Sequence, residues 1–177
     1  MQRLIGFGLA VLLIGALAGT AAAQGTPAGA GAPIVPGQAL GSFQLGQDVD
    51  AVVTSLGPLH SQDDLSGKGL IGYYWPLRRL GAIADKSTHK IVALVVSLDD
   101  TYKTDKGVTA GSELEAVRTA YGREDSVDNH EDDETLVYDK LGVAFVVDKS
   151  GALGSRVSVI FVFNPGHYRD IFISGSQ

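Results

Sequence analysis

The sequence feature that most constrains the fold is a match of the chain to itself at an offset of 65 residues. Residues 46–57 align with residues 111–122, and the match continues downstream in the same order, where 91–95 corresponds to 157–161. The identical positions in the first stretch are Gly46/Gly111, Ala51/Ala116, Val52/Val117, Thr54/Thr119 and Gly57/Gly122. Several matches in one order predict two copies of a unit about 65 residues long. A chain of 177 residues has room for one compact domain built from that pair.

Each copy begins with the pattern of a short amphipathic helix. In the first copy, Asp48 is a natural N-cap, apolar residues follow at helical spacing, and Gly57 ends the pattern. In the second copy, residues 112–115 read Ser-Glu-Leu-Glu, the sequence of a capping box, and Gly122 ends a similar stripe. The predicted buried stripes are Val49, Val52, Val53 and Leu56 in the first helix, and Leu114, Val117 and Tyr121 in the second.

Three strand-like runs rich in Val, Ile, Phe and Tyr follow each helix. The runs are 70–75, 81–85 and 90–98 in the first copy and 135–138, 142–148 and 156–163 in the second. Because the links between them are short, an antiparallel meander is favoured over parallel crossovers. We expect an α+β fold made of two tandem helix-plus-three-strand antiparallel repeats. Their helices would pack on one face of a shared sheet and leave the other face uncovered.

These motifs resemble a known family. The run Leu40–Gly46, a helix closed by Leu56-Gly57, and the second-copy run from Tyr102 to Val108 through Ala120-Tyr121-Gly122 are similar to the tandem modules of the beta-lactamase inhibitor protein (BLIP) superfamily and of the BamE (SmpA/OmlA) assembly lipoproteins. The resemblance covers residues 38–163 and implies a BLIP-like, exported, non-enzymatic protein-binding module. The chain departs from both groups in having no cysteine, since the inhibitors carry disulfides and the lipoproteins a lipid-modified cysteine.

The chain divides into five segments by composition. Residues 1–23 have the charged start, apolar run and small-residue end of a secretory signal peptide, with cleavage expected after Ala23. The alternative is a membrane anchor, but the apolar run is shorter than the roughly 20 residues that span a bilayer. Residues 24–37 predict a flexible Gly/Ala/Pro-rich leader, 38–100 and 101–163 the two α+β repeats, and 164–177 a C-terminal tail. We therefore expect a periplasmic or extracellular protein with no membrane insertion after signal cleavage.

Charge and motifs exclude several functional classes as first expectations. Lys and Arg number 14 against 20 Asp and Glu, a net charge of −6, so the chain lacks the basic surface that nucleic acid requires. The four histidines lack the paired spacing of a helical zinc site, and no nucleophile elbow, P-loop or Gly-x-Gly-x-x-Gly motif follows a predicted strand. The sequence predicts no catalytic residue, no metal and no cofactor.

A cluster of aromatic residues marks the first strand run. Tyr73 and Trp75 alternate with Tyr74 and therefore point to the opposite face of the sheet, and Tyr138 occupies the matching place in the second copy. An aromatic on the open face would be an anchor for a partner protein, since Trp and Tyr are enriched in binding hot spots, and Arg78 would flank that surface. The alternative for either face is packing in the core.

The second charge feature is an acidic run. Residues 124–134 contain seven acids and no base, including Asp132, Asp133 and Glu134. The run predicts a solvated mobile loop; cation binding and electrostatic steering of a partner are the alternatives. In the partner-binding hypothesis, Trp75 supplies affinity and the acidic loop raises the association rate.

These observations favour one function over another. The leading hypothesis is an exported, non-catalytic protein-binding or inhibitory module of the bacterial envelope, which uses the open face of its sheet to bind another protein. The alternative is a secreted hydrolase or metal-dependent protein whose acidic residues converge in a cleft, because carboxylate partners lie far apart in many glycosidase sequences.

Overall fold

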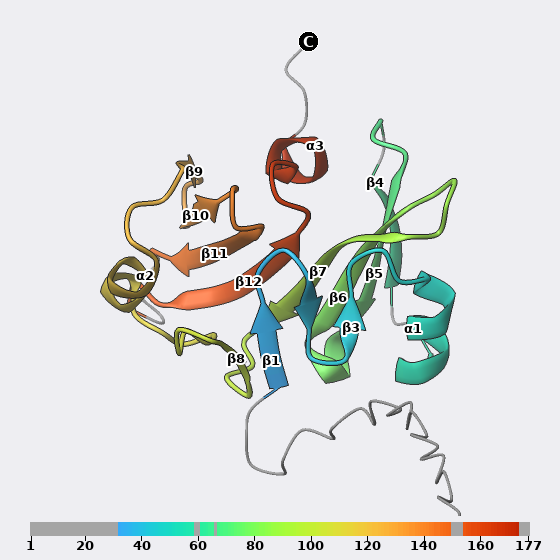
Figure 1. The fold of residues 1–177 in the computed structure, drawn as a ribbon, viewed down its shortest axis with the longest axis horizontal. Helices are drawn as coiled ribbons and strands as arrows, with labels where there is room; N and C mark the ends of the chain where they lie inside the picture. The colour runs from blue at the N-terminus through green and yellow to red at the C-terminus, as the bar shows by residue number, and fades with distance from the viewer. Residues whose placement is uncertain (1–31, 59–60, 66, 150–153, 174–177) are drawn as a thin grey trace, which may run out of the picture.

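The computed structural model describes residues 32–58, 61–65, 67–149 and 154–173. The fold is mostly β, and its largest element is an eight-stranded antiparallel sheet in the order β4-β5-β6-β7-β12-β11-β10-β9 (Figure 1). The first four strands are β4 (Ser61–Leu65), β5 (Leu70–Trp75), β6 (Leu80–Asp85) and β7 (Ile91–Ser97). The last four are β9 (Ser126–Asn129), β10 (Asp133–Tyr138), β11 (Val143–Asp148) and β12 (Val157–Phe163). A mixed sheet of four short strands and a few short helices complete the fold.

The small sheet has the order β3-β2-β1-β8, and β1 pairs with β8 in parallel. Its strands are β1 (Ala32–Val35), β2 (Ala39–Leu40), β3 (Phe43–Gln44) and β8 (Tyr102–Thr104). The helices are α1 (Val49–Leu56), α2 (Leu114–Tyr121), α3 (Tyr168–Phe172) and the 3-10 turn η1 (Pro76–Arg78).

Each half of the large sheet consists of four strands in sequence order, and one short helix precedes each half. The halves join where β7 pairs with β12, with Val96 opposite Ile160. The six predicted strand runs and their antiparallel pairing are present. The expected count of three strands per half is wrong, because β4 and β9 add one strand to each outer edge. Both are polar edge strands, so they lack the apolar alternation that identifies a half-buried strand.

Two helix starts test the capping predictions. Asp48 caps α1 as expected, since its Oδ1 accepts a hydrogen bond from the Asp50 amide at 3.0 Å. The capping box at α2 is not formed. The hydroxyl of Ser112 instead accepts a bond from the Thr109 amide at 2.9 Å, and the N-cap is Glu113, which bonds Arg156.

The main core lies on the face of the large sheet that α1, α2 and the small sheet cover. Val52 of α1 and Val117 of α2 are buried there against the inward side chains of the strands, such as Phe145. Figure 1 shows α1 and α2 at opposite ends of the molecule, with β1 to β3 between them. Ile34 and Leu40 bring the small sheet into the same cluster, so one continuous core links both halves.

The opposite face is partly covered, contrary to the expectation of a wholly open face. Tyr168 and Ile171 of α3 are buried in a second cluster against Phe163, Val137 and other residues of the sheet. Figure 1 shows α3 on the other side of the sheet from β1 to β3. The physical reason is that the segment predicted as a tail (164–177) contains apolar side chains that need burial, and the described part of it folds back to bury them.

The start of the described chain also differs from the prediction. Strand β1 lies inside the predicted flexible leader (24–37), whose described part is therefore paired and partly buried. The Gly37 amide donates to the Gly142 carbonyl at 3.1 Å. Gly142 has φ +72°, and a side chain there would meet the Phe163 carbonyl at 2.2 Å, so this junction requires glycine. The predicted signal peptide (1–23) lies outside the described residues. No helix among the described residues is long and apolar enough to cross a membrane.

Candidate binding surface

The aromatic run of β5 is divided between the two faces of the sheet. Tyr73 and Trp75 point to the main core and stack with ring centroids 6.5 Å apart. Trp75 is 3% exposed, and its Nε1–H donates to the Gly57 carbonyl at 3.2 Å. The aromatic ring thus closes the C-terminal end of α1. Tyr74 points to the other face and is 37% exposed.

Tyr138 in β10 has the same role in the second half. It is buried, and its hydroxyl donates to the Gly122 carbonyl at the end of α2 at 2.9 Å. Burial, with a smaller contribution from Glu124, raises the pKa of Tyr138 to about 12, so the hydroxyl remains a donor at neutral pH. The sequence predicted partner-binding roles for Tyr73, Trp75 and Tyr138. Helix closure and core packing instead bury all three side chains, so none of them is exposed to a partner.

The acidic run is a hairpin in the structure, since β9 and β10 pair between Glu134 and Asn129. Arg118 pairs with Glu124 at 3.3 Å, and Lys140 pairs with Asp125 at 2.8 Å. A hydrogen bond from its own backbone amide and one from Arg118 lower the pKa of Glu124, and bonds from Lys140 lower the pKa of Asp125. The prediction of a mobile loop is therefore wrong. The acidic run forms a paired hairpin, and ion pairs neutralise part of its charge.

Three acids of this run were candidates for partner steering. Asp132 is exposed in the hairpin turn, whereas Asp133 and Glu134 are half-buried members of β10. β5 and β10 are five neighbouring strands apart in the sheet, which is roughly 24 Å at the usual spacing. The aromatic run and the acidic run therefore do not form one continuous surface, and the expected division of work between Trp75 and the acids is not supported.

The described histidines lie near single carboxylates on the surface. His89 Nδ1 is 3.2 Å from Asp50, His130 Nε2 is 3.6 Å from Asp128, and His167 Nδ1 is 3.0 Å from Asp170. His60 lies outside the described residues. Among the described residues, no group of three or more His, Asp or Glu side chains is arranged to hold a metal ion.

Exposed apolar side chains gather where β5 turns into β6. Leu77 in η1 is 99% exposed, and Leu98 after β7 is 54% exposed. Arg79 adopts the left-handed conformation and its Nη1 donates to the Leu98 carbonyl, which ties the turn to the end of β7. The hydroxyls of Tyr74 and Ser97 lie 3.4 Å apart at the same end of the sheet. We call this set of residues (Tyr74, Leu77, Arg78, Arg79 and Leu98) the turn surface.

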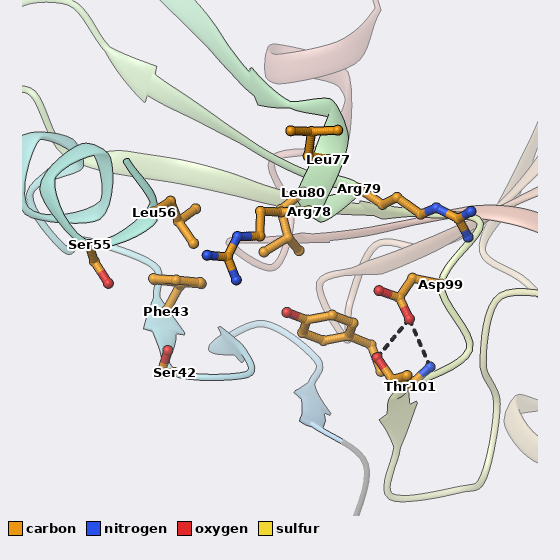
Figure 2. Close-up of a pocket in the computed structure, with 11 residues that line it drawn as sticks. Ser42, Phe43, Ser55, Leu56, Leu77, Arg78, Arg79, Leu80, Asp99 and Thr101 are labelled. Atoms are coloured by element: carbon orange, nitrogen blue, oxygen red, sulfur yellow. Dashed lines mark hydrogen bonds between the residues drawn. The ribbon is translucent and has the colours of Figure 1, made fainter. Parts of the chain in front are cut away.

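A groove of about 550 Å³ lies beside the turn surface, between η1, α1 and the β2–β3 hairpin. Phe43 and Leu80 are buried side chains that form its floor, and Leu56 lines one wall. Figure 2 shows Arg78 turned into the groove towards Leu56 and Phe43, whereas the side chain of Leu77, another residue of the lining, points in a different direction. The predicted residue Arg78 is thus at a surface, although that surface is formed by a turn and not by the face of Trp75.

Leu77 and Leu98 were not predicted as surface residues from the sequence. Each is a single leucine in a loop, and hydropathy treats such a residue as a core candidate. Leu77 lies between Pro76 and a pair of arginines, and this turn context was the only available sign that its side chain points to solvent.

Comparison with known proteins supports the fold and no more. The structure is similar to the crystal structure of the uncharacterized protein yfeY from Escherichia coli, with a TM-score of 0.51 and 16% sequence identity. The match covers 73% of this chain and 99% of that protein. No protein-family model matches the chain, and neither does any curated protein sequence.

Proposed function

We propose that this chain is an exported, non-catalytic binding module of the bacterial envelope, and that it contacts a partner protein through the turn surface. The observation that carries the proposal is the side chain of Leu77, which is 99% exposed at the tip of η1. Tyr74 and Leu98 are further large apolar side chains that are exposed near this end of the sheet. Large apolar side chains grouped in this way are typical of protein–protein contact sites.

Charge defines the chemistry of the partner. The whole chain has an excess of acids, with a net charge of −6, whereas the turn itself carries Arg78 and Arg79 beside Leu77, and Asp99 and Asp100 follow Leu98. A partner that places an apolar pocket over Leu77 and carboxylates around it would complement this surface. Complementary charge of this kind increases the association rate and selects against other partners.

Matching hydrogen bonds in the two halves of the sheet support the resemblance to BLIP-like tandem modules. The helix-end glycines Gly57 and Gly122 accept hydrogen bonds from Trp75 and Tyr138, which end β5 and β10. Isolated bridges join Asp48 to Lys90 and Glu113 to Arg156, again at matching places. We infer that the halves are copies of one module, as the offset of 65 residues in the sequence suggests.

The proposal is tested first by crosslinking. A photoreactive amino acid replaces Leu77 in the full chain, and a second variant carries it at Leu141, which is 44% exposed in the other half of the sheet. In envelope extract, one partner should crosslink at position 77 and not at 141. Equal crosslinking at both positions would count against a specific surface.

Affinity for the purified partner provides the decisive measurement. Leu77→Asp should weaken binding about 10-fold or more, as for a residue central to an interface, and Leu141→Asp should leave it within about twofold. If Leu77→Asp binds as tightly as the wild type, the turn surface is not the contact site. N-terminal sequencing of the exported form should give a chain that starts at Gln24, as expected for cleavage after Ala23.

A further inference from the structure

The groove beside the turn surface contains the exposed side chain of Arg78. Among the described residues, no hydrogen bond or ion pair is formed by the guanidinium of Arg78, whereas Arg79, its neighbour, bonds the Leu98 carbonyl. Figure 2 shows the Arg78 side chain extended into the groove. A planar guanidinium presents five donors and suits a carboxylate, which it can bind through two parallel hydrogen bonds.

Other donors line the same groove. Ser42 and Ser55 are exposed lining residues, and the described structure contains no hydrogen bond from either hydroxyl. Tyr102 also lines the groove, and burial raises the pKa of its hydroxyl, so this group remains a donor at neutral pH. The one carboxylate in the lining, Asp99, accepts bonds from the Thr101 amide and hydroxyl at 3.0 and 2.6 Å. The groove therefore offers several donors, and the lining contains Arg78 and Arg79 against one acid, Asp99, which keeps its charge.

The floor of the groove adds an apolar component. Phe43 and Leu80 are buried beneath it, and Leu56 faces the Arg78 side chain. A ligand that fills the groove must therefore combine a negatively charged group with a short apolar part. An acidic side chain next to an apolar one in a peptide has this combination, and its backbone can continue towards Leu77.

We propose that the groove binds a carboxylate of an acidic–apolar peptide segment, with Arg78 as the residue that recognises the charge. This inference rests on the proposed function, since the segment would belong to the partner that contacts the turn surface. It adds the chemistry of recognition: a Glu or Asp side chain held by Arg78, with Ser42, Ser55 and Tyr102 as the surrounding donors.

The test uses a defined probe, the capped dipeptide acetyl-Leu-Glu-amide, titrated into the full chain after signal removal and followed by amide NMR shifts. A ligand of this size should bind with a Kd on the order of millimolar. Shifts should concentrate at Phe43, Ser55, Leu56 and Leu80, which line the groove. Acetyl-Leu-Gln-amide, which differs only in charge, should bind at least tenfold more weakly, and so should acetate, which lacks the apolar part.

Three variants complete the experiment. Arg78→Gln should weaken binding of the Glu probe at least tenfold, whereas Arg123→Gln, which changes an exposed arginine in the other half of the chain, should change it less than threefold. Arg78→Lys should fall between the two, since an ammonium keeps the charge and loses the paired geometry. Equal binding of the Glu and Gln probes, or full binding by Arg78→Gln, would overturn the carboxylate site.

The outcome separates the two proposals. If Leu77→Asp weakens the partner complex while Arg78→Gln leaves both the complex and the Glu probe unaffected, the turn surface holds and the carboxylate site fails. If the Glu probe depends on Arg78 while Leu77→Asp leaves the partner complex intact, the groove is a carboxylate site and the proposed contact at Leu77 is wrong.

Discussion

The position of each aromatic side chain determines whether it stabilises the fold or is exposed for binding. Trp75 and Tyr138 end their strands on the same face of the sheet, and each donates a hydrogen bond to the carbonyl of a helix-closing glycine. The bond satisfies one of the carbonyls that a helix leaves unpaired at its C-terminus. Their bulk also fills the space between helix and sheet, so their main contribution is to stability.

Substitution separates these two contributions. Trp75→Ala should destabilise the protein by about 3 to 5 kcal/mol, the usual effect of removing a buried ring, whereas Tyr138→Phe removes one hydroxyl bond and should cost about 1 kcal/mol. Urea denaturation followed by far-UV circular dichroism gives both values. A Trp75→Ala protein as stable as the wild type would contradict the buried position of the ring.

Asp85, at the β6–β7 turn, makes a pH-dependent contribution to the stability of the fold. Its Oδ1 accepts bonds from the amides and hydroxyls of Ser87 and Thr88, which lower the pKa of Asp85 to about 2. A lowered pKa means that the stabilisation is fully present above the unfolded value of about 3.9 and is lost as pH falls through about 2.

We therefore expect Asp85→Asn to reduce the stability above pH 4 and to flatten its decrease between pH 4 and pH 2. The measurement is the denaturation midpoint of variant and wild type across that range. Asp100→Asn, an exposed acid without a hydrogen bond among the described residues, serves as the control and should follow the wild-type curve. Parallel curves for Asp85→Asn and the wild type would show that the turn bonds do not stabilise the carboxylate.

At the scale of elements, α3 is the part of the fold whose position depends on few contacts. Besides its buried aromatic face, it is held by Lys68, whose Nζ donates to the carbonyls of Asp170 at 3.0 Å and Ile173 at 2.7 Å. A lysine at the carbonyl end of a helix is favourable because of both the hydrogen bonds and the helix dipole.

Lys68→Ala should loosen α3 without unfolding the sheet. Losing charged hydrogen bonds worth about 1 to 2 kcal/mol corresponds to roughly 5- to 30-fold faster amide exchange in residues 168–173. Lys86→Ala, which removes an ion pair with Asp64 in the same half, is the matched control and should leave α3 unchanged. Unchanged exchange in α3 of the Lys68 variant would mean that aromatic packing and the bond from the Tyr168 amide to Asp139 hold this helix without Lys68.

The elements also show how far sequence patterns can predict this structure. The strands of the large sheet that have two bonded neighbours were found because burial on at least one face leaves an apolar pattern. β4 reads Ser-Gln-Asp-Asp-Leu, and such a polar edge strand has the composition of a loop, since charge on an edge protects it from pairing with other chains. β1 was missed for another reason: it is a four-residue strand next to a Gly/Ala-rich segment, and besides its local pairing with β2 it pairs in parallel with β8, about 70 residues away in the sequence.

The candidate site was predictable only in part. Strand alternation correctly separated Tyr74 from Tyr73 and Trp75, but alternation alone does not say which face the helices cover. That choice depends on long-range packing of α1, α2 and the small sheet. Arg78 was predicted as a surface residue from its turn, whereas the groove it enters is assembled from segments distant in sequence, such as Phe43 and Tyr102.

At the scale of the whole molecule, the two halves of the sheet share one core. The β7–β12 pairing joins them, and β1, which precedes the first half, pairs with β8, which precedes α2. The main cluster contains residues from both halves, including Leu94 and Val162, which lie opposite each other at the junction. Two copies of a module that share their core in this way are expected to depend on each other for stability.

We therefore predict that the protein unfolds in one cooperative transition. Trp75 is the only tryptophan and reports on the first half, whereas far-UV circular dichroism reports on both. The two signals should give the same urea midpoint, because opening either half would expose the apolar face of the other along the β7–β12 junction. Leu94→Ala, at the junction, should lower both midpoints together, with a loss of about 2 to 5 kcal/mol.

A second experiment expresses the two halves separately, as residues 32–100 and residues 101–173. Each half should lack a cooperative transition, since it would expose an unpaired strand edge and half of the core. Two separate midpoints, or a stable isolated half, would instead mean that each module folds independently and that the β7–β12 junction does not contribute to the stability of either one.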